Sequence, residues 1–327
     1  LKPVNFHMVE LTKEKNLEQG IIKSIEKAIA NDTGILFSYS FRFEVRDLLP
    51  ILTHPSDKNT TRIYWEQPSQ GFSFAGLGSI LEFQSTDIEN SEEINNQINN
   101  IMGMGISVTD NSLIGPRIIG GFAFNNYKGN DDTWKNFPRK HFLLPECLGT
   151  STDDGTWLTI SRIVHPNEKL DTIINELTRT ISYYENRLPV TLPPISRVAV
   201  DKFRDVPDQQ TYNNTIFSVL GNIKPGQLEK VVISRSHHVK VGKDFSVISA
   251  MQVLRNAYSN CTSFFFSLPG RGTFFGCTPE RLIRLKNGYI QTEALAGTIA
   301  RGNNMEEDRI LGETLLDSHK EREEHNL

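Results

Sequence analysis

Four segments of the chain repeat apolar residues every three or four positions, which is the spacing of an amphipathic helix. They cover residues 17–29, 170–181, 212–223 and 247–257. Residues 306–327, rich in Glu, Lys and Leu, predict a further helix with Leu311, Leu315 and Leu316 on its buried side. We expect the first four helices to pack their apolar stripes against a sheet.

Shorter runs of β-branched and aromatic residues, bounded by Gly, Pro, Asn or Asp, predict strands. These runs are residues 34–41, 61–67, 117–124, 157–164, 230–235, 262–268 and 281–285. Pro269-Gly270 and Asn287-Gly288 predict hairpin turns. Because hairpins join antiparallel strands, the sequence predicts an α+β fold with a largely antiparallel sheet and helices packed on it.

A proline-rich stretch from Leu188 to Pro194 is the best candidate for a boundary within the chain. It separates a first part, residues 1–195, from a second part, residues 206–327. Most of the candidates for catalytic or ligand-binding residues lie in the second part.

Composition narrows the possible partners. The sequence has 35 basic and 39 acidic residues, a net charge of −4 at pH 7, and no basic run, so we expect no nucleic-acid partner. We find no run of about 18 apolar residues and expect no membrane-spanning helix. The cysteines, Cys147, Cys261 and Cys277, are odd in number and far apart, which favours a reducing compartment and a cytoplasmic protein.

Two residues of the second part are candidates for acid–base chemistry. Lys230 opens the apolar run KVVISR, and Glu280 lies in TPERL, where Pro279 favours a turn at the edge of the sheet. Taken alone, each is more often an ordinary surface residue. In an enclosed pocket, however, a lysine can act as a base and a glutamate as an acid.

Two further segments carry candidates for ligand binding. TEALAGTIARG, residues 292–302, contains Ala296, Gly297 and Thr298, small residues that let backbone amides approach an anion. In the last predicted helix, Glu321 and Glu324 are three residues apart and share one face, where paired carboxylates can hold a hard cation such as Mg²⁺. Alone, each pattern is more typical of a turn or of a solvated helix face.

Together, KVVISR, TPERL, LAGTIARG and DSHKEREEH, in this order, resemble the motifs of the chorismate-utilising enzymes. That family includes isochorismate, salicylate, anthranilate and aminodeoxychorismate synthases. The resemblance is strong from about Pro207 onward and weaker in YWEQPSQGFSFAGLGS and RIIGGFAF. It implies a two-lobed α+β fold in which large, mainly antiparallel sheets face each other around the active site.

The resemblance also implies roles for individual residues. Lys230 matches the general base and Glu280 the general acid. Glu324 matches a magnesium ligand, with Glu321 as its supporting carboxylate. The chorismate-binding stretch would be lined by Ala296, Gly297 and Thr298.

Lys230 discriminates within the family, because the members that use an amine nucleophile typically lack a lysine at the start of this strand. By resemblance, water is then the nucleophile and the expected activity is that of an isochorismate synthase, similar to those of menaquinone biosynthesis. A siderophore-pathway isochorismate synthase and a salicylate synthase, which also eliminates pyruvate, are the alternatives. We expect no amidotransferase subunit and a monomer.

The family pattern continues beyond Leu327 with a second pair of metal carboxylates, so we expect this sequence to lack the carboxy-terminal end of the fold. A non-catalytic remnant that only binds other molecules is the alternative from another class. Lys230, Glu280 and Glu324 are all present, which favours the enzyme.

Overall fold

The computed structural model describes residues 5–54, 60–86, 92–124, 134–188, 191–195, 200–223, 230–243 and 245–326. Its helices are α1 (Asn5–Asn31), α2 (Glu92–Met104), α3 (Leu170–Arg187), α4 (Gln209–Ile223), α5 (Val247–Ala257), α6 (Met305–Asp317) and α7 (His319–Asn326), with short 3-10 helices η1 (Leu49–Thr53) and η2 (Pro68–Gln70). The α+β class predicted from the sequence is confirmed.

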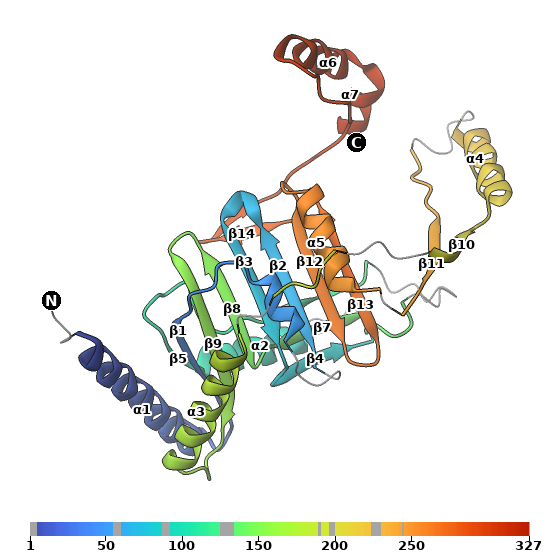
Figure 1. Cartoon of the computed structure of the whole chain (residues 1–327). Coiled ribbons are helices and arrows are strands. Elements are labelled where there is room, and N and C mark those ends of the chain that lie inside the picture. Colours follow the sequence, from blue (N-terminus) through green and yellow to red (C-terminus); the bar gives the residue numbers. More distant parts are fainter. Residues whose placement is uncertain are drawn as a thin grey trace.

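One eight-stranded sheet forms the centre of the molecule (Figure 1). In spatial order its strands are β13 (Gly272–Thr278), β12 (Thr262–Leu268), β2 (Arg62–Gln67), β3 (Phe72–Leu77), β8 (Cys147–Thr152), β9 (Gly155–Val164), β1 (Ile35–Arg42) and β5 (Ile106–Val108). Neighbours are antiparallel except for β1 and β5. Because β12 pairs with β2, the sheet runs continuously from the first part of the chain into the second.

Three smaller sheets accompany it. One contains β4 (Leu81–Ser85), β7 (Lys140–Leu144) and β6 (Ile119–Phe122). The other two are hairpins, β10 (Val200–Val206) with β11 (Ser236–Val241) and β14 (Arg284–Lys286) with β15 (Tyr289–Gln291). Asn287 and Gly288 both have positive φ, 52° and 79°, as a two-residue hairpin turn requires, so that predicted turn is confirmed.

The main hydrophobic core lies on one face of the large sheet. Helices α1, α3, α5 and η1 cover this face and bury apolar side chains against the strands. Core residues from the helices and strands include Ile21, Leu49, Ile173, Leu177, Met251, Phe37, Tyr64, Leu158 and Phe265. Burial of each such side chain stabilises the folded state by about 2 kcal/mol, because it removes apolar area from water. The predicted stripes of α1, α3 and α5 are therefore confirmed as sheet-packing faces.

The opposite face of the large sheet is rich in aromatic residues. Trp65 stacks on Phe74 with the ring centroids 6.4 Å apart. The ring centroids of Phe264 and Phe274 are 5.0 Å apart. The β4–β7–β6 sheet covers part of this face and forms a second, smaller core around Ile63. Elsewhere the burial of this face varies, because Leu148, Thr150 and Thr159 are buried whereas Trp65 and Phe74 are half-buried.

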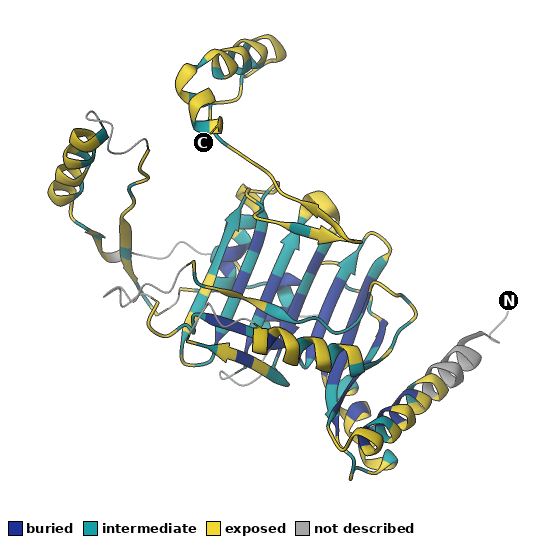
Figure 2. Cartoon of the chain, turned by 180° about the vertical axis from the view of Figure 1, so that it is seen from behind, coloured by how far each residue is buried: buried dark blue, intermediate teal, exposed yellow. Residues whose placement is uncertain are grey.

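Two segments lie away from the large sheet (Figures 1 and 2). Helix α4 stands beside the β10–β11 hairpin and has no buried residue; Phe217 is 72% exposed. The expectation that its stripe packs against a sheet is therefore wrong for the described residues. Helices α6 and α7 form the other outlying segment, and Ser318 divides them where one helix was predicted. Within the described ranges, no helix is long and apolar enough to span a bilayer.

The run KVVISR, predicted as a strand over residues 230–235, has no regular structure. Its β-branched residues favour extended backbone, but a strand also requires a neighbour that accepts its hydrogen bonds. β10 supplies that neighbour only from Ser236 onward, where β11 begins. Lys230 therefore precedes the strand by six positions rather than opening it.

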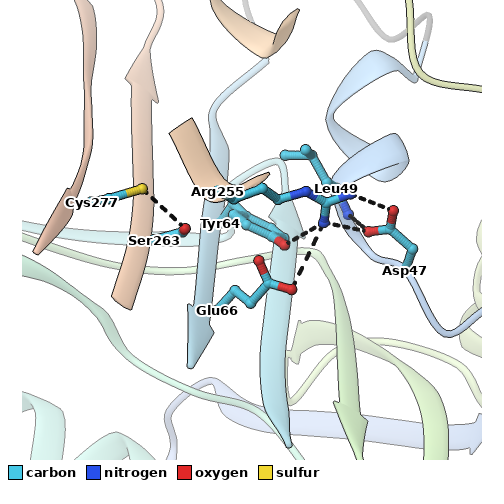
Figure 3. Close-up of polar contacts among 7 residues, drawn as sticks. All are labelled: Asp47, Leu49, Tyr64, Glu66, Arg255, Ser263 and Cys277. Carbon is cyan, nitrogen blue, oxygen red and sulfur yellow. Dashed lines mark hydrogen bonds and ion pairs between the residues drawn. The ribbon is translucent and has the colours of Figure 1, made fainter. Parts of the chain in front are cut away.

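A polar cluster, called the clamp below, joins Arg255 of α5 to Asp47, Tyr64 and Glu66 in the first part of the chain (Figure 3). The Arg255 guanidinium donates hydrogen bonds to both carboxylate oxygens of Asp47, at 2.9 and 2.7 Å, and to the Tyr64 hydroxyl at 3.2 Å. Its Nη1 also lies 3.8 Å from Glu66 Oε1. Asp47 Oδ1 additionally accepts the backbone N–H of Leu49, which fixes the start of η1. Burial alone would raise the pKa of Asp47, but the hydrogen bonds and charge of Arg255 hold it below its usual range.

We expect Arg255→Met to lower the free energy of unfolding by about 1–3 kcal/mol, because it leaves Asp47 without its partner. Urea denaturation measures this loss. The matched control is Arg204→Met, which removes an exposed arginine of β10 and should change stability by less than about 0.5 kcal/mol. Equal denaturation midpoints for the two variants would show that the clamp does not stabilise the fold.

Candidate functional site

The stretch TEALAGTIARG, residues 292–302, has no regular secondary structure and ends against the start of α6. The Asp308 carboxylate accepts hydrogen bonds from Arg301 Nε at 2.6 Å and from the Gly302 backbone N–H at 2.9 Å. Asn304 caps α6, because its side chain accepts the Glu307 N–H at 2.9 Å. These bonds fasten the stretch to the helix that follows it.

Gly297 lies against α7, the helix that carries the two candidate metal carboxylates. Its φ is +82°, a conformation that favours glycine. A Cβ at this position would meet Glu321 Oε2 at 2.9 Å and Leu315 Cδ1 at 3.3 Å. The absence of a side chain at Gly297 therefore allows the stretch to approach Glu321 closely.

Lys230 reaches the same helix from a distant point in the sequence. Its Nζ donates a hydrogen bond to Glu324 Oε1 at 3.0 Å, across 94 positions of sequence. Both side chains are partly exposed, at 42% and 35%. The structure thus brings together three segments predicted to form one site, through Lys230, Gly297 and α7.

Glu280 follows β13 and is exposed. Its backbone N–H donates to the Thr278 hydroxyl at 3.2 Å, which holds the turn after Pro279. Its carboxylate makes no hydrogen bond or ion pair with Lys230, Glu321 or Glu324 within the described ranges. Of the predicted site residues, Glu280 is therefore the one that the structure leaves apart from the others.

Glu321 and Glu324 offer hard oxygen ligands one helical turn apart, the donor chemistry that Mg²⁺ prefers. Each of these carboxylates is also paired with a lysine. Lys320 Nζ lies 3.2 Å from Glu321 Oε1, and Lys230 Nζ lies 3.0 Å from Glu324 Oε1. The residues therefore fit a divalent cation in kind. In the described part of the chain, no cluster of three or more His, Cys, Asp or Glu residues completes the site.

Sequence reasoning missed Arg301 and Asp308, which fix the position of the candidate binding stretch. A signal was present, because Asn304 followed three residues later by Glu307 is the pattern of a capped helix start. That pattern places the start of α6 directly after the stretch and thereby brings Asp308 within its reach.

Residues 23–327 match the family of chorismate binding enzymes. Because this match covers nearly the whole chain, the protein belongs to that family, and the recognition made from the four ordered motifs is confirmed.

Two relatives and one solved structure illustrate the likeness. The chain is 27% identical to isochorismate synthase MenF of Bacillus subtilis over 97% of this chain and 68% of that protein. It is 26% identical to the salicylate biosynthesis isochorismate synthase of Pseudomonas aeruginosa over 93% of this chain and 62% of that protein. The structure of MenF, the menaquinone-specific isochorismate synthase of Escherichia coli, has a TM-score of 0.67 at 20% identity, covering 94% of this chain and 66% of that one. The chain therefore spans about two thirds of the length of these relatives.

We expect Gly297→Ala to loosen the contact between residues 292–302 and α7, because the added methyl meets Glu321 and the positive φ becomes strained by about 1 kcal/mol. Hydrogen–deuterium exchange should show faster exchange of the amides in 297–302. Gly312→Ala is the matched control, since a Cβ at that position in α6 meets nothing within 4 Å. Unchanged exchange in Gly297→Ala would contradict the proposed close approach.

Proposed function

We propose that this protein is a magnesium-dependent isochorismate synthase that adds water at ring carbon 2 of chorismate while the hydroxyl leaves carbon 4. The contact between Lys230 Nζ and Glu324 Oε1 at 3.0 Å carries the proposal, because it places the candidate base beside a candidate metal ligand. The relatives named as isochorismate synthases support this choice over the amine-using branch of the family.

In this mechanism Lys230 removes a proton from the attacking water, and Glu280 donates a proton to the departing hydroxyl as the diene shifts. The atoms balance, because one water enters and one leaves. Lys230 has to leave its ion pair with Glu324 and release its proton to water first, since an ammonium already carries the proton it would accept. Glu280 has to be enclosed in the working site, because a general acid needs a protonated carboxyl beside the departing hydroxyl.

We assign Glu324, supported by Glu321, to holding Mg²⁺, which when bound neutralises the ring carboxylate of chorismate. The backbone of Ala296 and Gly297 and the Thr298 hydroxyl would contact the substrate. The close approach of Gly297 to Glu321 supports this assignment, because it brings the substrate stretch next to a metal carboxylate.

We further propose that the protein acts in the cytoplasm as a monomer. It works without an amidotransferase subunit in this proposal, because a reaction with water as the nucleophile needs no ammonia donor. Menaquinone biosynthesis is the proposed pathway. The relative from salicylate biosynthesis favours a second candidate, an isochorismate synthase that supplies a salicylate pathway.

The full-length protein should convert chorismate to isochorismate with Mg²⁺ and lose that activity when EDTA removes the metal. Chromatography of the products measures both. Formation of salicylate and pyruvate would instead identify a salicylate synthase, and anthranilate formed from ammonia would overturn the choice of water as nucleophile.

Lys230→Ala should reduce turnover by a factor of about 100 or more, because the variant lacks the proposed general base. Circular dichroism should show the fold unchanged, since the Lys230 side chain is 42% exposed. Lys240→Ala is the matched control, because Lys240 is an exposed lysine on β11 that should not affect turnover. Near-normal turnover of Lys230→Ala would refute the assigned base.

A further inference from the structure

A cavity of about 360 Å³ lies at the β5 edge of the large sheet, between β1, β5, the end of α2 and the connection formed by residues 109–117. β13, which leads into the turn of Glu280, forms the opposite edge, seven strands away (Figure 1). At about 4.8 Å per strand, this separation amounts to about 30 Å. The cavity is therefore remote from the proposed acid, and neither Lys230, Gly297 nor Glu324 lines it.

The lining of this cavity combines a single cation and several hydroxyl groups with apolar side chains. Its polar side chains are Ser38, Ser107, Thr109, Ser112 and Arg117, and all its other lining residues are apolar or glycine. Thr109 is already engaged, because its Oγ1 donates to the Asn111 carbonyl at 3.0 Å. Among the residues that the structure describes, no carboxylate contributes to the lining, so the cavity favours an anion over a cation.

Arg117 is a half-buried cation with unused hydrogen-bonding capacity. Its Nη2 donates to the Leu113 carbonyl at 2.8 Å, and its Cζ lies 5.4 Å from the centroid of the Phe72 ring. Its Nε is buried and has no hydrogen-bond partner within the described ranges. Burial lowers the pKa of this guanidinium, and no described carboxylate counteracts that effect. An anion in the cavity would supply both an acceptor and the opposite charge.

A pair of serines places a further donor in the same cavity. Ser38 and Ser107 are partners in the register of β1 and β5, and the buried Ser38 donates from Oγ to Ser107 Oγ at 3.0 Å. The Ser107 hydroxyl is exposed and has no acceptor in the described part of the chain, so it can donate to a ligand. An added Cβ at Gly115 would lie 3.2 Å from Ser107 Oγ. The absence of a side chain there brings the connection that carries Arg117 close to this hydroxyl.

The strand register places an apolar wall next to these donors. Leu36 precedes Ser38 by two positions, and alternate residues of a strand share a face, so both side chains border the cavity from β1. Leu36 and Ile114 are buried, and Met102 of α2 adds a flexible apolar side chain. A ligand that contacts both kinds of wall has an anionic group and an apolar body.

We propose that this cavity is a binding site for a small monocarboxylic acid with an apolar body, aliphatic or aromatic. Arg117 and the Ser107 hydroxyl bind the carboxylate, and Leu36, Met102 and Ile114 contact the apolar body. Inorganic phosphate fits less well, because a dianion meets a single cation here and leaves the apolar wall unused. Chorismate fits less well too, because its second carboxylate finds no cationic partner among the described lining residues.

Isothermal titration calorimetry on the full-length protein tests the proposal with benzoate and hexanoate and with their uncharged counterparts benzamide and hexanamide. EDTA is present, so that a carboxylate bound through a metal ion does not contribute. At least one carboxylate should bind, and its amide should bind on the order of tenfold more weakly. Failure of both carboxylates to bind at about 10 mM, equal affinity for the amide, or tighter binding of inorganic phosphate would overturn the proposal.

Variants with one donor removed assign the binding to this cavity. Arg117→Gln should weaken carboxylate binding on the order of tenfold while leaving the amide unaffected, and Ser107→Ala should weaken it about threefold. The matched controls Arg204→Gln and Ser218→Ala change exposed residues outside the cavity and should bind as the wild type does. Because Ser107 is exposed, its variant should fold normally even if Arg117→Gln does not. Wild-type affinity in either cavity variant, or displacement of the carboxylate by chorismate, would contradict the assigned site.

Discussion

The clamp formed by Arg255 with Asp47 and Tyr64 connects residues 208 positions apart in the sequence. Bringing together the ends of an unstructured loop of that length costs about 5 kcal/mol of chain entropy. The local preference of the chain for strands and helices cannot offset this entropy cost. Contacts between β12 and β2 therefore have to offset it. Phe265 packs beside Tyr64 in the same core, and Arg255 adds directional bonds that only one register satisfies. The continuous eight-stranded sheet depends on this junction.

The same junction explains why the chain is not two independent units. β12 and β13 belong to the second part in sequence, yet they extend a sheet whose other strands come from the first part. Helix α5 covers them and reaches back to η1. The turn that carries Glu280 leaves directly from β13, so the position of the proposed acid is set by the large sheet. Lys230, Gly297 and α7 belong instead to the outlying segments, and their mutual contacts hold them together.

Much of the fold follows from the sequence wherever periodicity and burial agree. Residues 157–164 and 262–268 alternate or run apolar, and both form strands of the large sheet. The predictions from sequence fail where the structure of a segment depends on a neighbouring strand or sheet. Val231 and Val232 favour a strand, but the described structure gives them no neighbouring strand, and the α4 stripe likewise meets no sheet. At the candidate site, motif order predicted Lys230, Gly297 and Glu321, and the structure brings their segments into contact. The attachment of residues 292–302 by Asp308 depends on side-chain contacts that spacing alone does not specify.

The contact between Lys230 and Glu324 has a physical consequence for the proposed chemistry. A carboxylate shared between an ammonium and a divalent cation cannot serve both fully, because each requires its negative charge. In the proposed mechanism Glu324 would therefore keep Lys230 near the site and would have to release it once a metal ion bound the carboxylate. Partial exposure of both side chains makes that exchange inexpensive, since water solvates the ammonium as it departs. Under the proposed function, a lysine placed in this way would stay close to the reacting water without being locked into the ion pair, and the carboxylate assigned to the metal would also position the proposed base.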